Sequence, residues 1–168
     1  MKECTLSKQE ILDRISSAGI VGLGGATFPT HVKLAPPPGS KAEVLIINAV
    51  ECEPYLTSDH ALMMTKGDEI LVGVSILMRA LKVSRAVIGI ENNKKDAILR
   101  LSQLAMDYPG IEVMPLKVQY PQGGEKQLID AVLRKQVKSG ALPISAGAVV
   151  QNVGTVFAVY EAVQKNKP

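Results

Sequence analysis

The sequence has no tryptophan, two cysteines and few aromatic residues of any kind. Because it contains only four tyrosines and two phenylalanines, its core must be aliphatic, and few rings are available for nucleic-acid bases to stack on. The cysteines, Cys4 and Cys52, form no Cys-x-x-Cys pair, so they cannot assemble a zinc or iron–sulfur site by themselves. We therefore expect no metal site in this chain and a reducing, cytoplasmic environment.

Long apolar runs and blocks of like charge are missing as well. No apolar run reaches the ~20 residues that a membrane-spanning helix needs, and the first residues lack the apolar core of a signal peptide. The 19 basic and 16 acidic residues are scattered along the chain and form no basic stripe. These absences predict a chain with no transmembrane segment of its own and no nucleic-acid partner.

The 168 residues, 46% of them hydrophobic, suffice for one domain with one core. Ser7 and Glu10 form a capping box, which predicts a short first helix that ends at Gly19. The unbroken apolar run over 44–47 predicts a strand covered on both faces. Elements then alternate: a helix over 68–82, a strand over 86–90, a helix over 94–106, a strand over 111–118, and helices over 125–133 and 155–164. This alternation is typical of an α/β fold with a mostly parallel sheet.

The densest motif is a glycine-rich loop over 19–33. Its glycines let backbone amides approach an anion without obstruction by side chains; they are Gly22, Gly24 and Gly25. The loop fails the dinucleotide fingerprint, because Thr27 takes the third glycine position and a helix precedes it, and it also lacks the Gly-Lys-Ser/Thr of a P-loop. From spacing alone, a phosphate site and a tight turn without a ligand both remain open, and Phe28 and Lys33 favour the phosphate site.

A polar cluster follows the strand predicted over 44–47. This is the edge at which open α/β sheets usually bind ligands. Asn48 is able to bond the edge of a planar heterocycle, and Glu51 and Glu53 are suited to contact sugar hydroxyls or a carboxamide. The alternatives are a solvated acidic loop and, for Cys52, a small buried residue in a turn.

Two further turns carry glycine and polar residues. Gly124 and Glu125 lie in a strand-to-helix turn that would expose helix N-terminal amides to an anion. Asn152 and Thr155 flank the start of the last predicted helix, where phosphate contact and simple helix capping are both compatible with the sequence, and capping is the simpler explanation.

The two histidines, His31 and His60, form no metal-binding trio with nearby cysteines, and their spacing indicates no Ser-His-Asp arrangement. Both are interpreted as structural residues.

Four motifs together resemble the C subunit of the Rnf membrane complex and, more distantly, the flavin-binding subunit of respiratory complex I. They are Gly-Leu-Gly-Gly-Ala-Thr-Phe-Pro-Thr-His-Val-Lys, Asn-Ala-Val-Glu-Cys-Glu-Pro-Tyr, Tyr-Pro-Gln-Gly-Gly-Glu-Lys and Val-Val-Gln-Asn-Val-Gly-Thr, and the match covers residues from about Gly19 to Val163. The resemblance implies a modified Rossmann-like, three-layer α/β domain that holds FMN, accepts hydride from NADH and passes electrons singly to iron–sulfur clusters.

The resemblance also implies roles for individual residues. Glu53 would be the catalytic residue, facing the nicotinamide, and Phe28 would stack on the adenine of NADH. Lys33 would add a fixed positive charge beside the flavin phosphate region, which the loop glycines cradle. The remaining residues implied to contact the cofactor are Asn48, Glu51, Gly124, Glu125, Asn152 and Thr155.

The sequence departs from the complex I pattern at five motif positions. Leu23 stands in place of arginine, and Thr27 and His31 stand in place of glycine. Val50 replaces an aspartate and Lys126 a glutamate, so two acidic contacts to flavin or dinucleotide are lost. The Rnf pattern tolerates these changes better.

The C subunits of Rnf complexes are longer than this chain. The resemblance therefore implies that residues 1–168 form a single FMN- and NADH-binding domain, a fragment whose 4Fe-4S clusters belong to an absent downstream region. It further implies that the domain works with other subunits of an ion-translocating electron transport complex, peripheral on the cytoplasmic face of the inner membrane.

Three other functions remain open. A cobalamin reductase of a microcompartment would use the same module to deliver electrons to a corrin. A docking domain without redox chemistry is suggested by Val50 and Lys126 at cofactor-facing positions. Phosphate-ester hydrolysis ranks last, because it needs a base and usually a metal.

Overall fold

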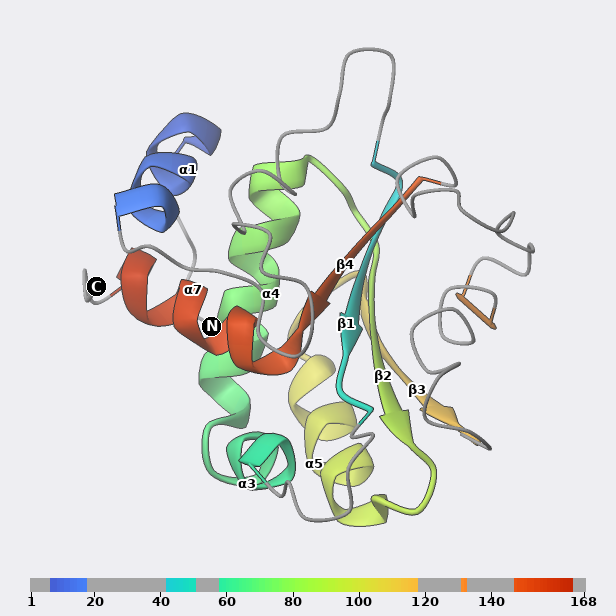
Figure 1. Cartoon of the computed structure of the whole chain (residues 1–168). Helices are drawn as coiled ribbons and strands as arrows, with labels where there is room; N and C mark the ends of the chain where they lie inside the picture. Colours follow the sequence, from blue (N-terminus) through green and yellow to red (C-terminus); the bar gives the residue numbers. More distant parts are fainter. Residues whose placement is uncertain (1–6, 18–41, 51–57, 118–130, 133–146, 165–168) are drawn as a thin grey trace.

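The computed structural model describes residues 7–17, 42–50, 58–117, 131–132 and 147–164 (Figure 1). Helix α1 (Lys8–Ser17) begins at the predicted capping box. The Oγ of Ser7 accepts a hydrogen bond from the backbone N–H of Glu10 at 3.2 Å and donates one to Glu10 Oε1 at 3.1 Å. The predicted stop at Gly19 lies outside the described residues.

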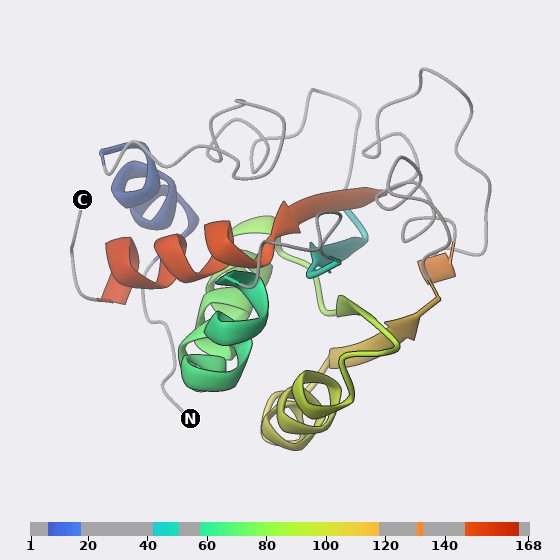
Figure 2. The same cartoon turned by 60° about the horizontal axis from the view of Figure 1, so that its bottom comes forward.

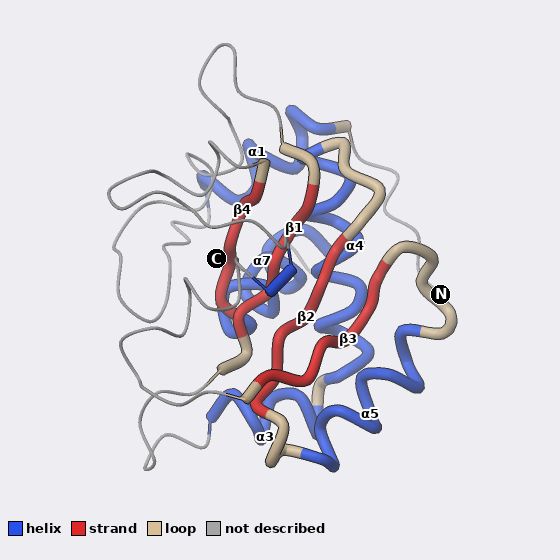
Figure 3. Tube along the Cα trace, turned by 90° about the vertical axis from the view of Figure 1, so that its right-hand side faces the viewer, coloured by secondary structure: helices blue, strands red, loops and turns tan. Residues whose placement is uncertain are grey.

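Four described strands form a parallel sheet in the order β3-β2-β1-β4 (Figure 3). The strands are β1 (Val44–Asn48), β2 (Ala86–Glu91), β3 (Ile111–Leu116) and β4 (Ala148–Asn152). Apolar residues of β1 and β2 are buried on both faces, as expected for central parallel strands. Strand β3, at one side of this sheet, tolerates Pro115, which has no N–H to donate to a neighbouring strand.

Apart from residues 131–132, the described helices gather on one face of the sheet (Figure 2). Helices α3 (Ser58–Thr65) and α4 (Gly67–Leu81) connect β1 to β2, and α5 (Lys95–Ala105) connects β2 to β3. Helix α7 (Val153–Gln164) follows β4 directly. Their apolar sides enclose the larger core together with alternate residues of the strands. The guanidinium of Arg14 in α1 donates to the carbonyl of Val163, which ties α1 to α7.

Helices α4 and α7 pack closely because Gly73 has no side chain. A Cβ at position 73 would lie 2.6 Å from the carbonyl oxygen of Val156 and 2.8 Å from its Cγ1. Real Cβ atoms are not found this close to a backbone atom, so glycine is required for the observed helix spacing.

A second apolar cluster covers the other face of the sheet. It contains Val44, Ile46, Val50, Val87, Leu116, Val132, Ala148 and Val150. Ala131 and Val132, which are helical, pack on this face and are the described part of the helix predicted over 125–133. The remainder of that layer lies outside the described residues.

The predicted α/β class and parallel sheet are confirmed. Helix α7 begins at Val153, two residues before the predicted start, and β3 ends at Leu116 instead of residue 118. The strand over Ala148–Asn152 and the helix over Ser58–Thr65 were not predicted from the sequence, and the structure contains both.

Candidate cofactor-binding edge of the sheet

The carboxyl ends of β1 and β4 bring two asparagines side by side. Asn48 ends β1 and Asn152 ends β4, and they are register partners in the parallel pair formed by these strands. The strand order reverses between β1 and β4, and ligands of open parallel sheets bind outside the carboxyl ends at such a reversal. One difference from an ordinary doubly wound sheet is that both strands lead to helices on the same face, α4 and α7. We call these strand ends the carboxyl edge.

Both asparagines use their side-chain oxygens to shape the turn that follows. Asn48 Oδ1 accepts a hydrogen bond from the N–H of Val50 at 3.0 Å, and Asn152 Oδ1 accepts one from the N–H of Gly154 at 2.7 Å. The second bond caps the start of α7, so the capping role predicted for Asn152 is confirmed. Each oxygen holds its turn with one hydrogen bond, and the Nδ2 groups of these half-buried side chains are donors that they offer a ligand.

Val50, the position at which the complex I pattern has aspartate, is part of the apolar core. Its side chain is 6% exposed and packs in the second apolar cluster with Val44 and Ile46. A carboxylate in that place would be desolvated. The valine therefore continues the core at this point and supplies no acidic contact.

A buried glutamine precedes Asn152. Gln151 is 2% exposed and lies in β4 opposite Ile47 of β1. Its Nε2 atom is buried and has no hydrogen-bond partner, a condition that it shares with Arg100 Nε in the part of the chain that the structure describes. Sequence reasoning passed over Gln151, although an amide inside the apolar run Val149-Val150 at a strand end was a usable signal.

Thr155, predicted at the cofactor edge, lies in the first turn of α7 and is fully buried. Its burial beside Val153 and Val156 places it in the wall of the larger core, directly after the capped turn.

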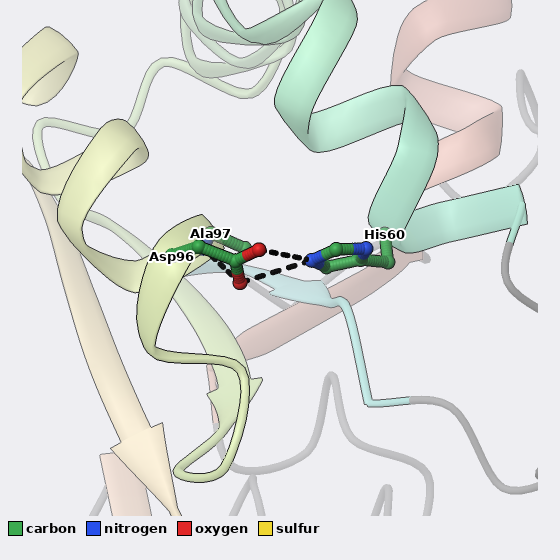
Figure 4. A network of polar contacts seen from close by, with 3 residues as sticks. All are labelled: His60, Asp96 and Ala97. Carbon is green, nitrogen blue, oxygen red and sulfur yellow. Dashed lines mark hydrogen bonds and ion pairs between the residues drawn. The ribbon is translucent and has the colours of Figure 1, made fainter.

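A contact between a histidine and a carboxylate joins the helices at the same edge of the sheet. His60 Nε2 in α3 lies 3.0 Å from both carboxylate oxygens of Asp96, in the first turn of α5 (Figure 4). The hydrogen bond with His60 is the main cause that lowers the pKa of Asp96 from 3.8, and a hydrogen bond from the N–H of Ala97 adds to it. This contact agrees with a structural role for His60 and fixes the start of α3 relative to α5.

The other predicted site residues lie outside the described residues, so their roles stay predictions. They are Gly22, Gly24, Gly25, Phe28, Lys33, Glu51, Glu53, Gly124 and Glu125. Cys4, Cys52, His31 and Lys126 lie there too. Across the ranges that the structure does describe, no group of three or more His, Cys, Asp or Glu side chains is placed to hold a metal, and no helix is long and apolar enough to cross a membrane.

Two oxidoreductase subunits are similar to this chain over nearly its whole length. The C subunit of the proton-translocating ferredoxin:NAD(+) oxidoreductase complex of Clostridium ljungdahlii is 50% identical over 163 residues, 97% of this chain and 35% of that protein. The C subunit of the Na(+)-translocating ferredoxin:NAD(+) oxidoreductase complex of Acetobacterium woodii is 48% identical over 154 residues, 92% of this chain and 35% of that protein. The chain thus spans about a third of the length of these relatives.

The fold is also found in an NAD+-reducing NiFe-hydrogenase in its H2-reduced state. That crystal structure superposes with a TM-score of 0.73 at 26% identity, over 94% of this chain and 31% of that one. The resemblance to the Rnf C subunit and to complex I flavin subunits is therefore confirmed at the level of fold and sequence. The family model of the Nuo51 FMN-binding domain matches residues 15–161, and the chain belongs to this family.

Proposed function

We propose that this chain is the FMN-binding module of an ion-translocating electron transport complex, and that it accepts hydride from NADH. The observation that carries the proposal is the pairing of Asn48 with Asn152 at the carboxyl edge. Amide donors gathered at the ends of two adjacent parallel strands suit a ligand rich in carbonyl and phosphate oxygens. FMN is such a ligand, and the family name supports it.

The described residues fit this cofactor. Asn48 and Asn152 would hold it through their Nδ2 donors, while their Oδ1 atoms keep the two turns in shape. Bound FMN would supply acceptance of two electrons as hydride from NADH and their release one at a time. The buried residues that precede the two asparagines in β1 and β4 exclude water on the protein side of the site.

The residues outside the described ranges take their proposed roles from the family resemblance. Glu53 would orient the nicotinamide, and Phe28 would stack on the adenine. Lys33 would neutralise the phosphate region, together with the loop amides. Glu51, Gly124 and Glu125 would complete the cofactor contacts.

The electron acceptors and partners are proposed from the relatives. Both are named as subunits of ferredoxin:NAD(+) oxidoreductase complexes that translocate ions, and this chain spans about a third of each. We propose that 4Fe-4S clusters in a downstream region accept the electrons and that the module works at the cytoplasmic face of the membrane, bound to other subunits. These names favour this setting over the cobalamin reductase alternative.

The test is a titration of the purified chain with FMN and then NADH. FMN should lose fluorescence on binding, and NADH added without oxygen should then bleach the flavin absorbance. Glu53→Gln should bind FMN normally but bleach at least about tenfold more slowly, because it lacks the charge that orients the nicotinamide. Glu43→Gln is the matched control, since Glu43 is an exposed carboxylate at the opposite end of β1.

The outcomes separate the candidate functions. Flavin binding without bleaching by NADH would remove NADH oxidation and leave a flavoprotein module. A folded chain with no affinity for FMN or NADH would remove both and support the docking domain, for which the buried Val50 at an acidic family position is the specific observation.

A further inference from the structure

The side-chain amide of Gln151 is buried next to the carboxyl edge, one residue before Asn152. The residue is 2% exposed, and Nε2 is shielded from solvent with no acceptor within reach among the described residues. Buried side-chain donors in native proteins nearly always have a partner, because an unsatisfied one retains the full cost of losing its water. The exception in β4 therefore needs a specific explanation.

Strand geometry gives the direction of this side chain. Gln151 alternates with Val150 and Asn152, and it shares a face with Val149, which packs in the larger core on the helix-covered side. Its register partner Ile47 belongs to the same core. Gln151 and Asn152 thus present amide donors on opposite faces of the end of one strand.

The other unsatisfied nitrogen of the described ranges has a simpler environment. Arg100 Nε lies near Gly67, where α5 meets the start of α4, and a Cβ on that glycine would be 3.4 Å away. Arg100 is half-buried and its guanidinium has further N–H groups that can meet water. The amide of a fully buried glutamine cannot reach water in this way. An apolar residue would fill the place of Gln151 without the desolvation cost.

We propose that Gln151 is a further cofactor-binding residue, whose Nε2 donates a hydrogen bond to an acceptor oxygen of bound FMN. The proposal rests on the proposed function. The described part of the chain leaves this donor unsatisfied, and it lies one residue before Asn152 and two before α7, whose N-terminal end favours oxygen acceptors and negative charge. The cofactor supplies the missing acceptor, and the cost of the buried amide is recovered on binding.

Two variants test the proposal by flavin affinity and by the thermal midpoint of the cofactor-free chain. Gln151→Leu should raise the Kd for FMN about tenfold, the value of one lost buried hydrogen bond. Its cofactor-free midpoint should equal or exceed that of the wild type, because the unsatisfied donor is removed. Gln151→Met should weaken FMN binding to the same extent as Gln151→Leu, because neither side chain carries a donor.

Riboflavin identifies the acceptor. An affinity loss that appears with FMN but not with riboflavin places the acceptor on the phosphate, and an equal loss with both places it on the flavin or ribityl part; either supports the proposal. Arg100→Met is the matched control, because it removes the other buried unsatisfied donor of the described residues, in helix α5, which packs on β3, and β3 and β4 are the outermost strands of this sheet. It should change the Kd for FMN by less than about twofold.

Three results would overturn the proposal. The first is an FMN affinity in both Gln151 variants within about twofold of the wild type. That result would leave the proposed function intact, and the acceptor for Gln151 Nε2 would then be an internal water. Another is a lower midpoint in cofactor-free Gln151→Leu, which would give the amide a folding role. The last is a wild-type chain that binds no FMN, which rejects the proposed function as well.

Discussion

The packed interface of α4 and α7 and the carboxyl edge of the sheet are built in opposite ways. The interface is apolar and fully buried, and it is so close that Gly73 leaves no room for a methyl group beside Val156. The carboxyl edge lies at the ends of β1 and β4, directly before α7. It gathers amide side chains and leaves Gln151 Nε2 without a partner among the described residues. The interface is satisfied within the chain, whereas we propose that a ligand completes the edge. Substitutions in the two regions should therefore affect different measurements.

Gly73→Ala should have the largest effect on stability. The added Cβ meets the carbonyl oxygen of Val156, and because this is a backbone atom, the helices must move apart. We expect the free energy of unfolding to fall by about 2–3 kcal/mol, the usual cost of overpacking a core. Chemical denaturation measures this value. The FMN affinity of the molecules that remain folded should be unchanged.

Gly67→Ala is the matched control for this prediction. A Cβ at position 67 would lie 2.7 Å from Leu104 Cδ1, the far end of a flexible side chain that can turn away. Gly67 is the first residue of α4, so alanine gains there only part of the roughly 1 kcal/mol that it gains over glycine in a helix interior. The free energy of unfolding should therefore change by less than about 1 kcal/mol. Equal losses in the free energy of unfolding for Gly73→Ala and Gly67→Ala would contradict the close packing of α4 against α7.

The interface was far easier to predict from sequence than the edge. The apolar run over 44–47 and the helical spacing over 68–82 predicted β1 and α4 to within a residue, because burial of apolar side chains leaves a local pattern. Helix α3 was missed because Ala61, Leu62, Met63 and Met64 form a continuous run, without helical spacing. Strand β4 was missed because its apolar run is short and ends at Gln151.

The site was predicted only in part, for a related reason. Asn48 and Asn152 were identified from their positions at element ends and from the family motifs, but nothing in the sequence shows that their strands are neighbours. That pairing joins residues about a hundred positions apart in the chain and is a property of the whole sheet. The contact of His60 with Asp96 is non-local too, because it joins residues 36 positions apart. The unsatisfied donor of Gln151 becomes visible only when its neighbours are in place.

Asn152 tests the edge itself, because it serves both the fold and the proposed cofactor. Asn152→Ala removes the bond to the N–H of Gly154 and should lower the free energy of unfolding by about 1 kcal/mol, the usual value of a helix N-cap. Asn152→Asp keeps an oxygen acceptor at the start of α7 and should retain the stability. Both variants lose the Nδ2 donor and should bind FMN about tenfold more weakly. Denaturation and flavin titration on the same samples measure the two effects.

The aspartate variant decides between the two roles. If Asn152→Asp is as stable as the wild type and binds FMN equally well, capping is the whole role of Asn152, and the edge loses one of its proposed cofactor contacts. Asn48→Ala provides a comparison at the neighbouring strand, since Asn48 shapes a turn but caps no helix. It should lose FMN affinity with a smaller loss of stability than Asn152→Ala.

The smallest expected effect concerns the surface contact of His60 with Asp96. The pKa of Asp96 is lowered in the folded protein, chiefly by its hydrogen bond with His60. The carboxylate therefore stabilises the fold at pH values above 3.8, the pKa that we take for this group in the unfolded chain. That contribution should be lost as the pH falls below 3.8 through the folded pKa. Asp96→Asn should therefore lower the thermal midpoint slightly at neutral pH, and the difference from the wild type should vanish in acid.

The control is a surface ion pair, Arg85 with Glu112 at 2.9 Å, which joins the starts of β2 and β3 at the other edge of the sheet. Arg85→Gln should leave FMN binding unchanged, because it lies away from the carboxyl edge.

Asp96→Asn also tests whether the contact between α3 and α5 affects the cofactor. A weaker affinity for FMN in this variant would show that the contact supports the proposed site as well as the fold. A midpoint difference that is the same at neutral and acid pH would contradict the assigned cause of the lowered pKa, because a neutral asparagine cannot follow the titration of a carboxylate.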